Sequence, residues 1–409
     1  MQACGGTGND DFGNFKRTRK NGFTAVGIDD ECISPPKTSM LTPQLCVRTR
    51  SLLRVAAALS AILTLAASLA AAPPALKVIG SQLLTDDGHA VRLRGVNCAG
   101  LEWSSDGDGR IQKSIAVAVV DWRANLIRLP LSQDRWFGKA PEQADGGASY
   151  RKLVRHIVDF CANHGAYVLL DLHWSDAGEW GKNIGQHNLP DRNSIVFWKD
   201  FAPRFAADSN VLFDLYNEPS RITWDQWYRG GPMTETDEHR STTWRYEAVG
   251  LQTLAETIRA SGAKNVIVAS GLNWAYEVEG IPGEHEIADP TGRGVIYAMH
   301  PYPHKFEHTG LETVAQWTTR AEAFAKRLPL IVTEFGSDEA MWPFPKAWNY
   351  SDEKWNREML RVLEAHRWNW TAWDFHPAAS PCLLSDWNYT PTPQFGVWVK
   401  ATLAENLKR

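Results

Sequence analysis

The apolar residues of this chain gather in short runs that recur over most of its length. Eight runs have the length of a β-strand, and they cover residues 91–97, 124–130, 166–174, 211–217, 265–270, 294–300, 329–335 and 369–375. Within most of them, apolar side chains follow one another instead of alternating with polar ones. That pattern is typical of strands buried on both faces of a parallel sheet. The sequence therefore predicts eight parallel strands.

Amphipathic stretches between these runs predict helices. Residues 150–165 place apolar side chains at helical spacing and end at a glycine, which favours a helix end. Residues 244–262 and 351–368 follow the same pattern, and residues 394–409 are expected to form a last helix. Eight strands with helices between them in one domain favour an α/β fold of the (β/α)8 type, a TIM barrel, over an open doubly wound sheet.

The segment ahead of the barrel has a different pattern. Residues 76–97 alternate apolar and polar side chains on both sides of Asp87 and Gly88. An Asp-Gly pair between alternating segments favours a two-residue hairpin turn. We therefore expect an N-terminal β-hairpin.

The N-terminal residues carry an export pattern. Residues 48–73 run from arginines through an apolar, Ala-rich stretch to small residues and prolines, which is the order of a signal peptide. We expect cleavage and a secreted or periplasmic protein without stable membrane association. A retained segment would anchor the chain instead, because its length approaches that of a bilayer span. Residues 1–47 are then a non-native or dispensable extension, with Met40 as a better start, and residues 76–409 form the main domain.

Charge and composition narrow the functional classes. The net charge is −4 overall, and residues 1–72 hold eight of the 43 Lys and Arg and five of the 47 Asp and Glu, so the remainder has a net charge of −7. This acidity argues against a nucleic-acid partner. Three cysteines remain beyond residue 72, enough for one disulfide at most. All 19 tryptophans lie at Trp103 or beyond, which favours exposed stacking surfaces in addition to core packing.

Two glutamates stand at the ends of predicted strands. Glu218 follows the run "VLFDLY" and Glu334 follows "LPLIVT". In a barrel, both would reach the same mouth, where paired carboxylates fit glycosidic bond cleavage. Taken singly, each is as readily explained as a strand cap or an ion-pair partner. Arg128, inside the run 124–130, needs a carboxylate partner if it is buried.

Other chemistries find little support in the sequence. His300, His304 and His308 are spaced by four, but Pro301 and Pro303 disfavour the helix that would align them on a metal. A Cys-rich metal site, a Walker or dinucleotide-binding loop and a Gly-x-Ser-x-Gly motif are all missing from the sequence. We expect no metal and no cofactor.

The polar residues at the strand ends resemble glycoside hydrolase family 5, the cellulase family, over about residues 83–399. The usual active-site set of that family is an Arg, a His, an Asn-Glu pair, a His-x-Tyr, a second Glu and a Trp, in this order. The corresponding positions here are Arg128, His173, Asn217, Glu218, His300, Tyr302, Glu334 and Trp373. A shared order of eight positions is far more specific than either glutamate motif alone.

The resemblance assigns roles to the two glutamates. Glu218, after the fourth strand, would be the acid/base, and Glu334, after the seventh, would be the nucleophile of a retaining mechanism. Such a mechanism needs the two carboxyl groups roughly 5 to 5.5 Å apart. Asn217 would hold the 2-hydroxyl of the sugar being cleaved, and Arg128 and Tyr302 would stabilise the carboxylate of Glu334.

By the same resemblance, His173 and His300 would line the cleavage subsite and Trp373 would be its sugar platform. Further aromatic subsites are expected among the mouth-loop tryptophans, namely Trp174, Trp180, Trp224, Trp227, Trp274 and Trp342. The implied protein is a monomeric, endo-acting β-1,4-glucanase with a polysaccharide or oligosaccharide substrate. A β-mannanase or another β-glycanase on the same scaffold is the alternative, followed by a carbohydrate-binding barrel without activity.

Overall fold

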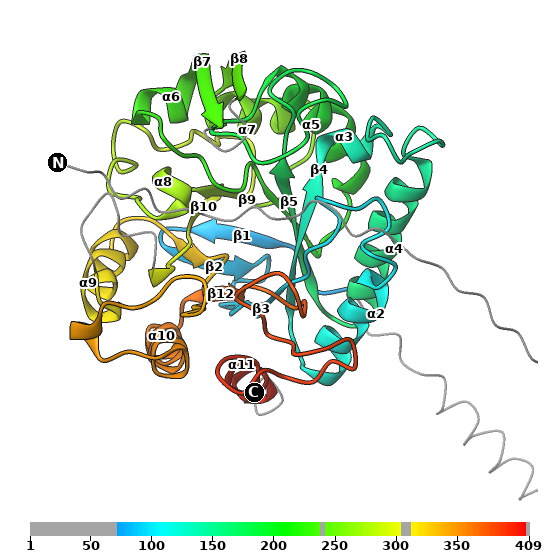
Figure 1. The fold of residues 1–409 in the computed structure, drawn as a ribbon. Helices are drawn as coiled ribbons and strands as arrows, with labels where there is room; N and C mark the ends of the chain where they lie inside the picture. The colour runs from blue at the N-terminus through cyan, green and yellow to red at the C-terminus, as the bar shows by residue number, and fades with distance from the viewer. Residues whose placement is uncertain (1–71, 238–241, 304–311, 406–409) are drawn as a thin grey trace, which may run out of the picture. The chain divides into compact units, whose positions relative to one another are not determined.

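The computed structural model describes residues 72–237, 242–303 and 312–405 (Figure 1). Eight parallel strands close into one barrel in the order β3-β4-β5-β6-β9-β10-β11-β12. The fold and all eight predicted strands are confirmed. The strands are β3 (Arg94–Asn97), β4 (Leu126–Ser132), β5 (Tyr167–Trp174), β6 (Val211–Asp214), β9 (Ile267–Ser270), β10 (Val295–Met299), β11 (Leu330–Val332) and β12 (Asn369–Ala372).

Helices surround the barrel in Figure 1. The longer ones are α4 (Ala148–Asn163), α5 (Arg192–Phe205), α7 (Leu251–Ala260), α9 (Val314–Ala325), α10 (Asp352–Ala365) and α11 (Gly396–Ala404). Side-chain caps define several starts, as where Asp191 and Ser194 form a capping box before α5. Shorter helical turns are α2 (Ile111–Ala116), η1 (Val117–Asp121), α3 (Gln133–Trp136), α6 (Trp224–Arg229), α8 (Leu272–Ala275) and η3 (Lys346–Trp348).

The predicted N-terminal hairpin is present, but its turn lies elsewhere. β1 (Leu76–Ile79) and β2 (Gln82–Thr85) pair antiparallel around residues 80 and 81. Asp87 and Gly88 form a second turn, which returns the chain to a single bridge between Leu84 and Ala90. Leu76 and Leu83 pack with the interior side chains of the barrel strands. The hairpin therefore closes the end of the barrel opposite the strand carboxyl ends.

One predicted helix is half wrong. Residues 244–262 were expected to be helical throughout, whereas β8 (Thr242–Val249) pairs with β7 (Gly230–Asp237) and α7 begins only at Leu251. Tyr246 and Ala248 are buried whereas Arg245 and Glu247 are exposed, which is a strand period over residues 245–248. Local periodicity continued a helical pattern across Gly250 because it does not reveal that β8 pairs with β7, the strand just before it in the chain.

Residues 1–47 and most of the predicted signal peptide at 48–73 lie outside the described residues, as do His304 and His308. Those predictions therefore stay predictions. Among residues 72–237, 242–303 and 312–405, none of the helices is long and apolar enough to cross a membrane. Cys98, Cys161 and Cys382 are all free thiols, so the one disulfide that the sequence allowed is not formed.

Candidate active site

Arg128 is the centre of the polar residues in the barrel. It lies on the second barrel strand, β4, and its side chain is 0% exposed. Nη1 is 2.6 Å from Oε1 of Glu334 and 3.1 Å from Oδ1 of Asn97, while Nη2 donates to Oδ1 of Asn217 at 2.7 Å. One guanidinium thus orients the predicted nucleophile and the predicted substrate-binding amide together.

Two buried aspartates complete the surroundings of Arg128. Asp171 and Asp214 pair in register on β5 and β6 and lie 3.0 and 3.1 Å from the guanidinium. Burial and the charge of Asp171 raise the pKa of Asp214 well above its usual range, against the opposing effect of Arg128. Burial opposes the charge of Arg128, but the charges of Asp171, Asp214 and Glu334 outweigh it and raise the pKa of the guanidinium. Arg128 therefore stays cationic.

Glu334 follows the seventh barrel strand, β11, and is 4% exposed. Its Oε1 accepts from Arg128, and its Oε2 accepts from the hydroxyl of Tyr302 at 2.7 Å. Burial and the charge of Glu334 raise the pKa of Tyr302 well above its usual range, so that Tyr302 remains a donor. Both carboxylate oxygens thus receive hydrogen bonds that stabilise negative charge.

Glu218 follows the fourth barrel strand, β6, and is 8% exposed. Its Oε1 is 2.8 Å from Nδ1 of His300, and its Oε2 accepts from Nε2 of Gln186 at 3.0 Å. The other nitrogen of His300, Nε2, is 2.7 Å from the hydroxyl of Thr333. The imidazole is therefore held on both sides.

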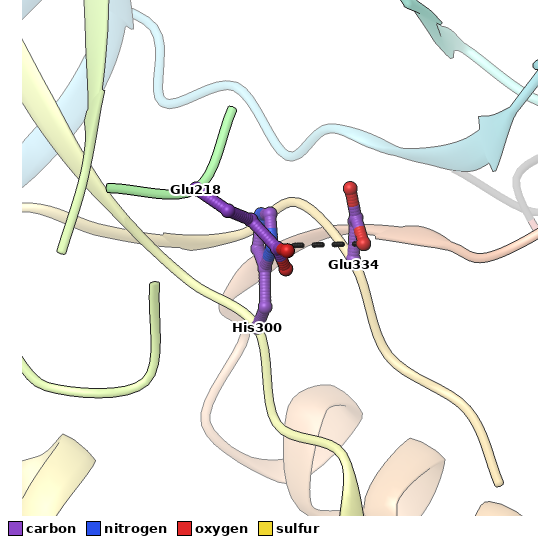
Figure 2. Close-up of side chains that lie close together, drawn as sticks. All are labelled: Glu218, His300 and Glu334. Atoms are coloured by element: carbon purple, nitrogen blue, oxygen red, sulfur yellow. Dashed lines mark hydrogen bonds and ion pairs between the residues drawn. The ribbon is translucent and has the colours of Figure 1, made fainter. Parts of the chain in front are cut away.

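The two glutamates converge on His300 (Figure 2). One carboxylate oxygen of Glu218, one of Glu334 and a ring nitrogen of His300 all lie within 4.8 Å of one another. This geometry would suit a cation. Each carboxylate oxygen, however, already faces a protein donor, and Arg128 supplies a positive charge beside Glu334. The donor set fits a charge-compensated carboxyl pair better than a metal site, and the expectation of no metal stays a prediction.

His173 and Trp373 form the adjoining wall. Nδ1 of His173 is 2.6 Å from Oδ2 of Asp171, and Nε2 is 3.2 Å from Nδ2 of Asn217. Burial lowers the pKa of His173, but the charge and hydrogen bond of Asp171 outweigh it and raise that pKa overall. The imidazole stacks on Trp373 with 5.6 Å between ring centroids. The structure thus brings all eight predicted positions together at the carboxyl ends of the barrel strands.

The loop tryptophans divide into two groups. Trp227 is fully buried and donates to the carbonyl of Ser270, so its prediction as an exposed platform is wrong. Trp224 packs edge-on against it. Both belong to α6, which the sequence placed in an open loop. Trp174, Trp180, Trp224, Trp274 and Trp342 are partly exposed and stay candidates.

Sequence reasoning missed several polar partners. Asp171 and Asp214 interrupt apolar runs as Arg128 does, and that interruption was a usable signal. Glu102 is 1% exposed, and burial raises its pKa to about 7 although the nearby His173 lowers it. Gln186 lies in a loop without periodicity, and nothing in the local pattern pointed to its contact with Glu218.

Comparison with known proteins assigns the family. The profile of Cellulase (glycosyl hydrolase family 5) matches residues 84–379. The chain belongs to glycosyl hydrolase family 5. The match spans every one of the eight site positions, from Arg128 to Trp373.

Individual relatives are distant. The endoglucanase MaCel5A of Microbulbifer sp. (strain ALW1) is 24% identical over 342 residues, which are 80% of this chain and 57% of the relative, so the chain spans little more than half of that protein. A β-glucanase of Saccharophagus degradans in complex with cellotetraose superposes with a TM-score of 0.61 at 22% identity, covering 82% of this chain and 94% of the other. The catalytic domain of a mannanase of Streptomyces sp. SirexAA-E superposes with a TM-score of 0.56 at 19% identity. The superposition covers 81% of this chain and 90% of the mannanase chain. At these identities, the structural likeness shows the fold alone.

Proposed function

We propose that this glycosyl hydrolase family 5 chain is a retaining β-1,4-glucanase that cleaves within the polymer. The observation that carries the proposal is the pair of carboxyl groups of Glu218 and Glu334, whose nearest ligand oxygens lie within 4.8 Å of one another at the mouth of the barrel. Retaining glycosidases place these groups roughly 5 to 5.5 Å apart, whereas inverting enzymes leave a wider gap for water.

The first half of the proposed reaction forms a glycosyl-enzyme ester. An oxygen of Glu334 bonds to the anomeric carbon, and the bond from that carbon to the leaving oxygen breaks. The electron pair goes to the leaving oxygen, which takes a proton from Glu218. Arg128 and Tyr302 each donate a hydrogen bond to one oxygen of Glu334 and orient its carboxylate before the attack.

The second half hydrolyses that ester. Glu218, now a carboxylate, takes a proton from water while the water oxygen bonds to the anomeric carbon. The ester bond breaks and its electron pair returns to Glu334. Both anomeric substitutions invert the carbon, so the product has the configuration of the substrate.

The substrate would be held by groups next to this pair. The side-chain oxygen of Asn217 accepts from Arg128, and its Nδ2 lies against His173 and Gln186. On substrate binding, one N–H of that amide would turn to donate to the 2-hydroxyl of the sugar. Trp373, partly exposed and stacked on His173, offers an aromatic face. Trp174 and Trp274 are proposed as further platforms, and His300 as a lining group.

The choice of glucan is supported by the name of the endoglucanase relative and by the cellotetraose complex of the S. degradans β-glucanase. A β-mannanase remains the second candidate because a mannanase shares the fold and loops, not the carboxyl pair, set the preferred sugar.

The experiment incubates the full chain separately with carboxymethylcellulose, mixed-linkage β-glucan and mannan, and separates the products by chromatography. Cleavage of the glucans with a range of oligosaccharides supports the proposal, and preference for mannan moves it to the second candidate. Glu218→Gln and Glu334→Ala should each lose activity by about 1,000-fold or more. If binding persists and neither the wild type nor the variants yield products, the chain is a carbohydrate-binding barrel instead.

We further propose that the protein is exported as a monomer after cleavage near residue 73. The support is the order of basic, apolar and small residues in 48–73. N-terminal sequencing of protein recovered outside the cytoplasm should begin within a few residues of Pro74. A mature protein that still carries residues 48–73 would favour the membrane-anchored form.

A further inference from the structure

Gln186 touches the predicted acid/base although it is none of the eight family positions. Its Nε2 donates to Oε2 of Glu218 at 3.0 Å, and its Oε1 accepts from Nδ2 of Asn217 at 3.5 Å. We propose that Gln186 is a positioning residue that orients Glu218 and stabilises its ionised form, the form that must activate water. This inference rests on the acid/base role proposed above for Glu218.

The backbone on both sides of Gln186 is tied to the strands that build the site. Gly185 exchanges backbone hydrogen bonds of 2.9 and 3.0 Å with Ser175, directly after β5. The amide of His187 donates to the hydroxyl of Tyr216 at 3.1 Å, and that hydroxyl donates to the carbonyl of His187 at 2.8 Å. Since Tyr216 directly precedes Asn217 in the chain, the loop and the acid/base segment are held as one unit.

The β7–β8 hairpin braces the same loop from outside. Glu235 of β7 is 8% exposed, and its Oε1 lies 3.2 Å from Nδ1 of His187. Its Oε2 accepts from the amide of Asn188 at 3.0 Å and from the hydroxyl of Tyr246 at 3.1 Å. The side chain of Gln186 is exposed, yet its backbone is fixed by buried groups. A fixed donor keeps its place over Glu218 without a large loss of side-chain entropy on binding.

Gln186 contacts a different oxygen of Glu218 from the one that faces His300. His300 faces one oxygen at 2.8 Å, an oxygen of Glu334 lies within 4.8 Å, and Tyr302 stands beside Glu334. Gln186 is a neutral donor to the second oxygen. A hydrogen bond donated to a carboxylate favours its ionised form over its protonated form. Removing that donor should therefore let Glu218 keep its proton to higher pH.

The test compares the full wild-type chain with Gln186→Met, which has a similar length but no donor. The substrate is the glucan that the wild type cleaves, and kcat/KM is measured from pH 4 to 10. The alkaline limb, which reports loss of the proton from the acid, should move upward by about half a pH unit. Gln186→Glu should move it further, because a like charge beside Glu218 disfavours its ionisation.

A leaving-group comparison separates this role from general damage. 2,4-Dinitrophenyl β-cellobioside needs no proton to lose its phenolate, so Gln186→Met should cleave it within about twofold of the wild-type rate of glycosylation. The same variant should lose about fivefold on glucan near the wild-type optimum. Gln252→Met on the outer helix α7 is the matched control, since Gln252 also donates to a glutamate, Glu256, at 2.9 Å. It should change neither the pH profile nor the rates.

The outcomes distinguish the two proposals. If the wild type cleaves neither glucan nor mannan, the proposed function fails and this inference falls with it. If the wild type is active and Gln186→Met has the same alkaline limb as the wild type, the proposed function stands and the role proposed for Gln186 is wrong. An equal loss on both substrates with an unmoved limb would likewise overturn it, because that is the result of a structural defect.

Discussion

At the level of single residues, one buried cation organises this site. Arg128 forms ion pairs with Glu334, Asp171 and Asp214 and also donates a hydrogen bond to Asn217. Removing a buried charge of this kind strongly destabilises the folded protein, because its partners are then left buried without an opposite charge. The planar fork of Arg matches several oxygens at fixed angles, whereas the ammonium of Lys is a point charge on a flexible stem. Charge alone is therefore insufficient here.

Arg128→Lys should lose most of its activity and part of its stability. We expect kcat/KM on glucan to fall by about 100-fold or more, because Glu334 and Asn217 lose their common orientation. The free energy of unfolding should fall by about 3 kcal/mol in urea denaturation. Arg204→Lys is the control, since Arg204 forms a half-exposed pair with Asp200 on α5, and it should change stability by less than about 0.5 kcal/mol. If Arg128→Lys and Arg204→Lys changed activity and stability equally, Arg128 would not be the residue that organises the site.

At the level of elements, the loop after β5 is anchored by a cluster of buried carboxyl groups. Asp134 of α3, Asp176 of the loop and Asp191, the N-cap of α5, are all 0% exposed. Burial raises the pKa of Asp134 to about 6 and that of Asp176 to about 9, and the charge of Asp191 adds to both shifts. The loop that carries Gln186 is thus fastened through buried carboxyl groups that keep their protons to higher pH in the folded chain than in the unfolded chain.

The pH dependence of stability follows from these raised values. The unfolded chain releases the protons of Asp134 and Asp176 at about pH 4, whereas the folded chain holds that of Asp134 up to about pH 6 and that of Asp176 up to about pH 9. The contribution of the cluster to the free energy of unfolding should therefore decrease as the pH rises through that range. Asp176→Asn should gain on the order of 2 kcal/mol relative to the wild type between pH 5 and pH 9, measured by urea denaturation at both values.

The pKa of Asp145 is shifted in the opposite direction from those of Asp134 and Asp176. Asp145 is exposed before α4, and hydrogen bonds from Ser149 lower its pKa. The contribution of Asp145 to the free energy of unfolding is present above the pKa that this carboxyl has in the unfolded chain, and it is lost as the pH falls. Asp145→Asn should therefore lose stability relative to the wild type as the pH rises. No gain for Asp176→Asn would show that the cluster is not protonated as described, and a gain for Asp145→Asn would contradict the lowered pKa of Asp145.

At the level of the whole molecule, the barrel closes where the first barrel strand, β3, meets the last, β12. Glu364 of α10 bridges this seam: its carboxylate is 2.7 Å from Arg92 and 2.9 Å from Arg94, and it accepts from Trp370 at 3.0 Å. Arg94 is 2% exposed. These groups lie at the start of the strands, away from the carboxyl ends that carry the catalytic candidates.

Glu364→Ala should separate stability from activity. It leaves the buried Arg94 without its carboxylate, so the free energy of unfolding should fall by about 3 kcal/mol. The value of kcat/KM on glucan at 25 °C should stay within about twofold of the wild type, because active sites of such barrels lie at the opposite face. Glu353→Ala, which breaks an exposed pair with Arg357, is the matched control for stability. A large loss of activity in the folded Glu364→Ala protein would contradict this division of the barrel.

The sequence by itself determined the eight strands, the barrel and the order of the eight polar positions. Continuous apolar runs fix which segments are buried on both faces, and a residue that follows such a run must emerge at the mouth. Those grounds predicted a carboxylate partner for Arg128 at the mouth, and the family resemblance implied that this partner is Glu334. The family profile matches residues 84–379, a range that contains all eight positions.

Only the tertiary structure decided which side chains meet. β8 became a strand because β7 pairs with it, Trp227 became a core residue because α6 packs against the carbonyl of Ser270, and Gln186 reached Glu218 because two loops are tied together. These outcomes depend on contacts with other segments, from the neighbouring strand β7 to residues 32 and 43 positions away in the chain. Local periodicity reports how a segment is buried, but the partner that buries it is set by closure of the barrel and the packing of its loops.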